Sequence, residues 1–431
     1  MDDPEGGIVH GESDDRDYWR PLGGSAKAGY AALDCESLRS SVRRLVTLNP
    51  YGRQALRLLE DYVIGPEVTV THRSSGRADD RFDAGTAAAA DEIWTGFLRR
   101  ASGHLSPREF GRRLWRDGEC FVRLFAEFDG ELTARFVDPE LIGSDGSGDG
   151  IDGIVSEPDD IETVLAYELL DAGRAVVSER VPADEMVHAR YGVDANERRG
   201  VSLFAAMLEP LEAYEKWLET ELAARRLQSS IVLWRKVQGS PSRVVAAAEG
   251  GAGGSGAEGV GREKIAPGTI VTTSAGKELQ FLQPQTNFGD ALPLGRSLLL
   301  AAAAAAGLPE FMLTADASNG NFASTMVAEG PAVKFFESEQ RRLAAELDVL
   351  RVRILNDAER RGLLPAGATG LLRAEWTFPQ LVGRDRSRDR DTDARLVEVG
   401  VLSRAEVARR DGVDAALMRD EIDAEAGDSS L

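Results

Sequence analysis

The residue types that most often carry out chemistry are few in this sequence, and they are scattered. Its histidines and cysteines are His10, His72, His104, His188, Cys35 and Cys120. They form no HxxxH pair and no CxxC pair, which are spacings that would favour a metal site. Two distant cysteines do not make a disulfide framework, so we expect a reducing compartment. The pattern predicts no metal, no cofactor and no catalytic residue, and therefore a protein that is not an enzyme.

A glycine-rich segment, residues 251–256 (GAGGSG), formally matches the GxGxxG fingerprint of dinucleotide-binding proteins. In that fold the loop follows a strand and opens a helix, so that the phosphate lies at the helix N-terminus. Here the segment lies inside a longer Gly/Ala/Ser stretch, residues 249–261, which is typical of a flexible linker. A nucleotide-binding enzyme remains an alternative hypothesis.

A small polar loop lies between two helical segments, within residues 307–325 (GLPEFMLTADASNGNFAST), and it includes no lysine or arginine. An N-cap for the following helix, from Ser318 or Ser324, explains part of this pattern. The loop also suits a surface that touches a moving polyanion without gripping it, because tight binding of DNA comes mainly from lysine and arginine on phosphates. The candidate contact residues are Thr314, Asp316, Ser318, Asn319, Asn321 and Phe322.

Hydrophobic periodicity around these candidates predicts an α+β fold. A helix is expected over residues 34–61, with an interruption at Asn49-Pro50, because the residue before a proline is pushed out of the helical region. Two more helices are expected over 91–99 and 107–116. Strand-like segments then dominate residues 120–191, and the first two, 120–128 and 132–137, are expected to form a hairpin around Asp129-Gly130.

Three further helices are expected in the second half of the chain, over residues 201–228, 293–306 and 324–361. The first is roughly 40 Å long, and Gly330-Pro331 should kink the third. A small β module, residues 229–286, lies between the first two helices, as a head on a two-helix stalk, and it includes an expected hairpin over 268–284 with its turn at 275–276. The apolar residues of the first helix need a partner, and neighbouring copies of the chain are the simplest one. These residues are Phe204, Leu208, Leu211, Tyr214, Leu218 and Leu222.

The composition bounds the possible functions. The chain has 431 residues, a net charge of −21 and 42% apolar residues, which is an ordinary content for a protein with a hydrophobic core. The acidic excess argues against tight wrapping of nucleic acid. No N-terminal segment has the layout of a signal peptide, and no apolar run reaches the roughly 18 residues that span a bilayer. We expect a soluble intracellular protein with no membrane partner.

Several segments, taken in order, resemble the portal proteins of tailed bacteriophages of the lambda type. They include LRSSVRRLVTLNPYGRQALRLLEDYVIG, RLWRDGECFVRLF, FVDPELI, RRGVSLFAAMLEPLEAYEKWLETELAARR, PGTIVTTSAGKELQFLQPQ and GLPEFMLTADASNGNFAS. Their order and spacing carry the resemblance over nearly the whole chain. It implies the portal fold, with a wing, a two-helix stem, a small β clip and an α-helical crown.

The resemblance implies a homo-oligomeric ring, usually a dodecamer, at one capsid vertex, which passes double-stranded DNA during packaging and ejection. The implied partners are the terminase large subunit, the major capsid protein or scaffold, and the head-completion or tail adaptor proteins that dock later. The implied location is the virion, with assembly in the host cytoplasm. The acidic excess would then form a channel wall that repels DNA. A prophage-derived or gene-transfer-agent portal or adaptor ring is the alternative.

The resemblance also assigns a region of the portal fold to each part of the chain. Residues 1–24 form a disordered arm, 25–200 the first part of the wing, 201–228 the first stem helix, 229–286 the clip, 287–307 the second stem helix, 308–323 the tunnel loop, 324–362 the kinked wing helix, and 363–431 the crown and C-terminal tail. The polar loop then lies at the narrowest point of the channel. The clip residues assigned to terminase or adaptor docking are Trp234, Lys236, Thr272, Lys277 and Phe281.

Overall fold

The computed structural model separates the chain into two compact units. Unit 1 comprises Met1–Ala205 together with Ala306–Leu431, and unit 2 comprises Ala206–Ala305. The structure describes residues 35–74, 84–127, 130–145, 152–157, 160–195, 197–230, 233–237, 242, 270–274, 288–316, 318, 322–381, 386–410, 413 and 415–428.

Unit 1 combines helices and antiparallel strands, which confirms the predicted α+β class. Its helices are α1 (Cys35–Leu48), α2 (Pro50–Leu59), α3 (Ala84–Ala101), α4 (Pro107–Asp117), α8 (Glu310–Thr314), α9 (Phe322–Arg360), α10 (Ala368–Leu371), α11 (Arg386–Glu398), α12 (Arg404–Arg410) and α13 (Ala415–Asp428). Its strands are β1 (Thr69–Ser74), β2 (Glu119–Ala126), β3 (Leu132–Val137), β4 (Ile154–Glu157), β5 (Asp160–Leu170), β6 (Val177–Pro182), β7 (Met186–Arg190) and β10 (Leu372–Thr377).

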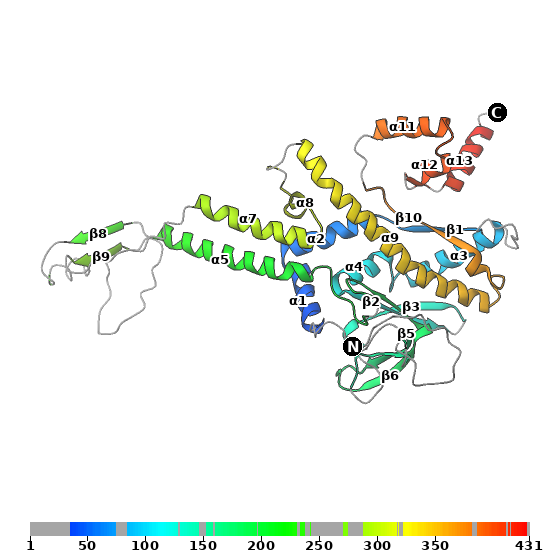
Figure 1. The fold of residues 1–431 in the computed structure, drawn as a ribbon, viewed down its shortest axis with the longest axis horizontal. Coiled ribbons are helices and arrows are strands. Elements are labelled where there is room, and N and C mark those ends of the chain that lie inside the picture. Colours follow the sequence, from blue (N-terminus) through cyan, green and yellow to red (C-terminus); the bar gives the residue numbers. More distant parts are fainter. Residues whose placement is uncertain are drawn as a thin grey trace, which may run out of the picture. The chain divides into compact units, whose positions relative to one another are not determined.

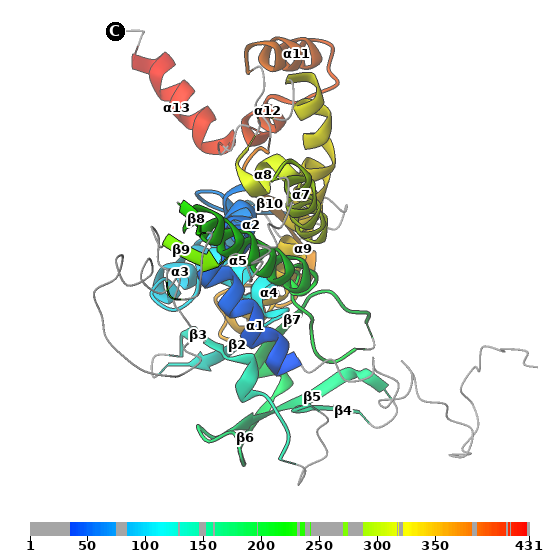
Figure 2. The ribbon, with the colours of Figure 1, turned by 90° about the vertical axis from the view of Figure 1, so that its left-hand side faces the viewer.

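The strands of unit 1 form three small sheets, with the orders β3-β2-β7, β4-β5-β6 and β1-β10. The first two sheets are seen in Figure 2. The expected hairpin of β2 and β3 is confirmed, with a register that runs from Phe121↔Val137 to Ala126↔Leu132. A hydrophobic core joins the first two sheets, and its buried members are Phe121, Ile142, Ile154, Tyr167, Val181 and Met186.

The expected interruption of the first helix is confirmed at Asn49. Its side-chain Oδ1 accepts hydrogen bonds from the backbone N of Tyr51 at 2.9 Å and of Gly52 at 3.0 Å, and Pro50 occupies the first position of α2. An Asn cap followed by proline is a favourable start for a helix, because the missing N–H of proline would have no partner there. The elbow between α1 and α2 is therefore encoded locally.

A buried carboxylate, Glu119 at the start of β2, holds several elements of unit 1 together. It accepts hydrogen bonds from Arg39 Nη1 of α1 at 2.9 Å and from Arg199 Nη2 at 2.7 Å. His188 Nε2 of β7 lies 3.2 Å away, and the backbone N of Gly200 donates at 3.3 Å. Burial alone would raise the pKa of Glu119, but Arg199 and His188 outweigh it and lower the pKa to about 2.

Hydrogen bonds to Glu339 fix helix α9 to the rest of unit 1. Glu339 accepts from Trp115 Nε1 at 2.8 Å and from Tyr191 Oη at 3.1 Å. Helix α9 begins at Phe322, so Ser324 lies inside the first turn and is not its N-cap. Pro331 lies within the helix, and the kink expected there stays a prediction.

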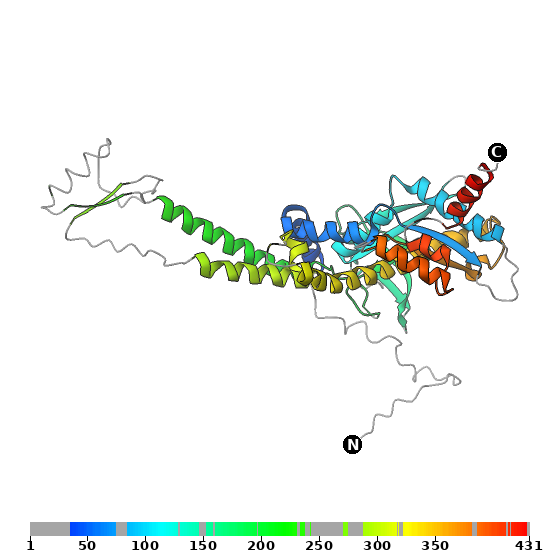
Figure 3. The same ribbon diagram turned by 90° about the horizontal axis from the view of Figure 1, so that it is seen from above.

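Unit 2 is built on two antiparallel helices, α5 (Leu208–Ser230) and α7 (Phe288–Ala305), which lie side by side (Figures 1 and 3). Strands β8 (Leu233–Val237) and β9 (Ile270–Ser274) pair in parallel. At 1.5 Å per residue α5 is about 35 Å long. The expected turn at 275–276 and the strand after it lie outside the described residues.

The predicted start of the first long helix at Val201 is wrong, because α5 begins at Leu208. The backbone N of Val201 donates to Tyr191 O at 2.8 Å, and that of Leu203 donates to Trp115 O at 3.1 Å. These long-range bonds hold the segment out of a helix. Helix α7, in contrast, begins earlier than predicted, at Phe288 and not at residue 293.

Replacing Glu119 by glutamine tests the buried carboxylate. We expect Glu119→Gln to lower the free energy of unfolding by about 3–5 kcal/mol near neutral pH, because Arg39 and Arg199 stay buried without a counter-charge. The folded-state pKa of Glu119, about 2, lies below its ordinary value of 4.5. Its stabilisation is therefore present above about pH 4.5 and is lost as the pH falls toward about 2.

Urea unfolding followed by circular dichroism between about pH 3 and pH 7 measures this difference. The exposed Glu162→Gln variant is the control, and it should match the wild type throughout. A difference between wild type and Glu119→Gln that stays constant over this pH range would contradict the assignment.

The seam of unit 2 offers a second test at Gly295 of α7. A Cβ at this position would lie 2.4 Å from the ring of Trp217 on α5. We expect Gly295→Ala to destabilise the protein by about 1–3 kcal/mol, because overpacking exceeds the gain in helix propensity. Gly330→Ala in α9 is the matched variant, since nothing lies within 4 Å of its Cβ, and it should gain up to about 1 kcal/mol. Thermal unfolding compares the two, and equal gains would refute the close contact.

Candidate channel and assembly surfaces

The polar loop expected at a channel is preceded by a short helix that the sequence did not predict. Gly307, with φ of 69°, ends the preceding helical segment, and α8 follows after Pro309. Gln54 Nε2 of α2 donates to Met312 O at 3.3 Å, and Leu313 is buried. Helix α8 is therefore attached to α2, and it fixes the point from which the loop starts.

The first part of the loop is an ordered turn. The backbone N of Asp316 donates to Thr314 Oγ1 at 3.3 Å, and the backbone N of Ser318 donates to Asp316 Oδ1 at 2.8 Å. Asp316 and Ser318 are exposed, so the turn presents a carboxylate and a hydroxyl to solvent. Asn319 and Asn321 lie outside the described residues. Phe322 is the first residue of α9, and its side chain also lies outside the description.

The six apolar residues expected on the first long helix do not form one surface. Phe204 precedes the helix and is completely buried, as is Leu211. Leu208 and Tyr214 are half-buried. Leu218 and Leu222, in contrast, are 39% and 48% exposed. Leu218 and Leu222 are therefore the most exposed of the six.

The sequence pattern did not predict that Trp217 of α5 packs between the two helices of unit 2. Its ring lies beside Gly295 of α7 and 5.6 Å from the ring of Tyr214, centroid to centroid. The nearest sequence signal was the glycine within an otherwise apolar helix, where a close approach of another group is expected. Helix α7 also leaves Leu292, Leu294 and Leu300 exposed.

Three of the five clip candidates lie on the paired strands of unit 2. Trp234 and Lys236 are on β8 and Thr272 is on β9, with the backbone register Trp234↔Val271 and Arg235↔Thr272. The other two, Lys277 and Phe281, lie outside the described residues. The parallel pairing therefore brings together residues that are about forty positions apart in the sequence.

Helix α5 is strongly acidic over its first turns. Residues 208–221 include five glutamates and one lysine, Lys216. Lys216 Nζ lies 3.8 Å from Glu212 Oε2, in an exposed pair one turn apart. With five carboxylates and one ammonium group over these turns, the helix has a negative surface beside its exposed leucines.

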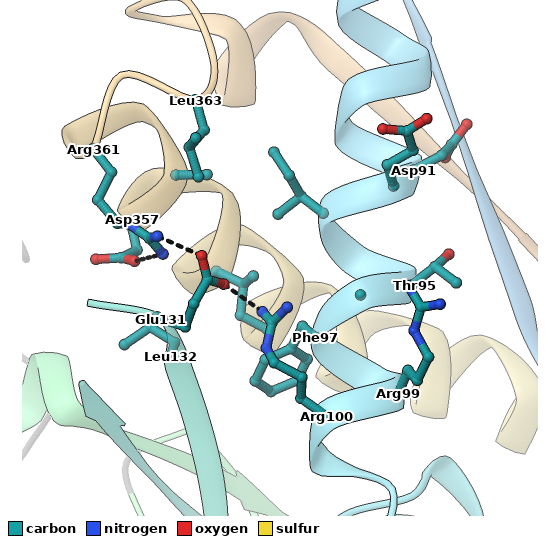
Figure 4. Close-up of a pocket in the computed structure, with 15 residues that line it drawn as sticks. Asp91, Thr95, Phe97, Arg99, Arg100, Glu131, Leu132, Asp357, Arg361 and Leu363 are labelled. Atoms are coloured by element: carbon teal, nitrogen blue, oxygen red, sulfur yellow. Dashed lines mark hydrogen bonds and ion pairs between the residues drawn. The ribbon is translucent and has the colours of Figure 1, made fainter. Parts of the chain in front are cut away.

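A cavity of about 640 Å³ lies between α3 and the C-terminal end of α9. As Figure 4 shows, Glu131 bridges Arg100 and Arg361 across it, with Arg100 Nη2 at 2.7 Å from Glu131 Oε2. Arg361 also pairs with Asp357 at 3.8 Å. These charged side chains are engaged with one another, and we assign the cavity no ligand.

Two structural findings bear on the remaining function classes. Among the residues that the structure describes, no group of three or more His, Cys, Asp or Glu side chains could hold a metal ion. No helix in the described part of the chain is long and apolar enough to cross a membrane. Among the described histidines, His72 and His188 have the most buried side chains. His188 binds Glu119, and its ring stacks on that of Phe121 with centroids 4.0 Å apart.

The family of the chain follows from comparison with known proteins. No curated protein sequence matches it. Its fold is similar to that of a chain in "Virion of native gene transfer agent (GTA) particle", with 15% identity, a TM-score of 0.42, and coverage of 90% of this chain and 96% of the other. A chain in "Neck of native GTA particle computed with C12 symmetry" is similar at 14% identity and a TM-score of 0.43, with coverage of 91% and 96%. Residues 12–340 match the family model "Phage portal protein, lambda family". Because this match extends over more than half of its length, the chain belongs to the lambda family of phage portal proteins.

Proposed function

We propose that this portal protein assembles into a closed ring, a dodecamer, at one vertex of a capsid, and that double-stranded DNA passes through the ring during packaging and ejection. Membership of the lambda portal family is the observation that carries this proposal. Unit 2 would provide the two-helix stem and the clip, and unit 1 the wing and the crown. The ring, and not the single chain, is then the functional object.

The exposed leucines of unit 2 support contacts between copies of the chain. Leu218 and Leu222 lie one turn apart on α5, while Leu294 and Leu300 are exposed on α7. Full burial of a leucine side chain contributes about 1.5–3 kcal/mol relative to exposure. Since the two pairs lie on different helices, a contact between copies can join different surfaces. Such heterologous contacts close into a ring when the rotation between copies permits it.

The charge of the chain supports a channel that does not bind DNA tightly. The net charge of the chain is −21. Negative walls repel the phosphate backbone over a Debye length, which is about 8 Å at physiological ionic strength. DNA would therefore move along the channel without forming strong ionic contacts.

The turn after α8 is proposed as the narrowest part of the channel. Thr314, Asp316 and Ser318 support this role because they form a polar turn without a cation, in which Asp316 and Ser318 are exposed. Asn319, Asn321 and Phe322 continue the same segment of sequence. A carboxylate at this point would repel DNA, and the hydroxyl would offer only weak contacts.

The clip is proposed as the docking surface for other components. The terminase large subunit would bind there during packaging, and head-completion or tail adaptor proteins would bind afterwards. Trp234, Lys236 and Thr272 on the β8–β9 pair are the proposed contacts, with Lys277 and Phe281 from the same region of sequence. The major capsid protein or scaffold would contact the wing, and assembly would take place in the host cytoplasm before the ring becomes part of the virion.

Reversing the charge at Asp316 tests the channel assignment. We expect Asp316→Lys to raise the affinity of the assembled protein for a short DNA duplex by about tenfold at low salt, because every copy then brings an ammonium group to the phosphates. The gain should disappear as salt increases. Fluorescence anisotropy of a labelled duplex at several salt concentrations measures the affinity.

The control is Glu162→Lys, which makes the same change of charge at an exposed residue of β5. It should bind DNA as the wild type does. Equal affinity gains for Asp316→Lys and Glu162→Lys would show that the turn after α8 has no special access to DNA, and would reject its assignment to the channel.

A further inference from the structure

The elbow between α1 and α2 is a basic segment on a strongly acidic protein. Residues 43–57 include four arginines and no aspartate or glutamate, whereas the whole chain has a net charge of −21. Arg43, like Arg39 before it, turns inward, where its Nε donates to Asp117 Oδ1 at 2.8 Å. Arg44 and Leu48 lie one turn apart on α1 and face solvent, and Leu48 is 71% exposed.

Arg53 of α2 adds a second exposed arginine to this segment. Its backbone N donates to Asn49 O at 3.0 Å, one turn after the elbow, and its side chain is exposed. With the residues that the structure describes, neither the Arg44 nor the Arg53 guanidinium forms a hydrogen bond or an ion pair. Arg44, Leu48 and Arg53 are called the elbow surface below. An exposed leucine that lies between two exposed arginines in the sequence fits a partner that presents apolar side chains beside carboxylates.

The outward face of α5 has this complementary composition. Leu218 and Leu222 are exposed one turn apart. Glu215 and Glu219 are also exposed one turn apart, and the spacing of three and four residues places all four side chains next to one another on the helix. These four residues are called the α5 face. Their apolar and acidic groups match the apolar and basic groups of the elbow surface.

We propose that the elbow surface of one copy binds the α5 face of the next copy in the ring. The inference rests on the proposed ring assembly and names the residues of one of its contacts. Arginine and carboxylate groups form strong charge-assisted hydrogen bonds, and the contact removes Leu48, Leu218 and Leu222 from water. Because the two surfaces differ, each copy uses one of them on each side, as a closed ring requires.

Charge reversal with mixing tests the contact in the full-length protein. The first variant is Arg44→Glu/Arg53→Glu, which reverses the elbow surface, and the second is Glu215→Arg/Glu219→Arg, which reverses the α5 face. We expect each variant alone to need at least about a tenfold higher concentration than the wild type to assemble, because like charges then face each other. Mass photometry over a concentration series measures assembly, and circular dichroism checks that each variant is folded.

An equal mixture of the two variants should assemble as well as the wild type. In an alternating ring every contact then joins either Glu to Arg or Arg to Glu, so opposite charges meet at each interface. A contact made within one chain would not recover on mixing, because both partners would stay mismatched inside every copy. Recovery on mixing therefore identifies a contact between copies.

The matched control is Arg99→Glu/Arg341→Glu, which makes the same change of charge at exposed arginines of α3 and α9. It should assemble as the wild type does. The inference is wrong if the reversed elbow variant assembles normally, or if its mixture with the reversed α5 variant does not recover. It is also wrong if the reversed elbow variant recovers instead on mixing with a variant in which acidic residues of α13, beside the exposed Ile422, are reversed. The proposed function stands in each of these cases. A wild-type chain that does not assemble at all would contradict the proposed ring itself.

Discussion

Two antiparallel helices can bury only the faces that they turn toward each other, and this limit governs unit 2. Trp217 of α5 fits beside Gly295 of α7, where a larger residue would collide with its ring. The same two helices leave leucines exposed on their other faces. In a protein of this acidity, those leucines and the glutamates beside them favour contact with a surface that is both apolar and basic. The proposed ring supplies such contacts from copies of the same chain.

Unit 1 is constrained in a different way, because charged side chains lie in its interior. Glu119 is completely buried, and it is stable as a carboxylate only because Arg39, Arg199 and His188 surround it. Removal of the carboxylate would leave the guanidinium groups of Arg39 and Arg199 without their counter-charge, so the cluster depends on Glu119. It fixes α1 to β2 and β7 and so sets which face of α1 points outward. The position of the elbow surface thus depends on a carboxylate that does not itself contact solvent.

The parts of the fold that could be predicted are those encoded by nearby residues. Asn49 and Pro50 define the elbow through capping and the missing N–H of proline, and the β2–β3 hairpin follows from alternating residues around a turn. The start of α5 could not be predicted, because backbone bonds to Tyr191 and Trp115 override a helical pattern at Val201–Phe204. Helix α8 was missed because five residues are too few to show periodicity.

The candidate surfaces could also be predicted only in part. The exposed leucines at 218 and 222 were among the predicted residues, but the pattern alone could not separate them from Phe204 and Leu211, which are buried. That distinction depends on which faces the rest of the fold covers. The elbow surface was not predicted at all, because Arg43 and Arg44 are adjacent and only the structure tells which of them binds Asp117.

Electron microscopy of the purified full-length protein in negative stain tests the central claim most directly. The account predicts top views of a closed ring with a central hole, in which every copy makes the same contacts with its two neighbours. Compact dimers with two-fold symmetry and no hole would contradict it, because they would show that the exposed faces pair with themselves and cannot form a channel for DNA.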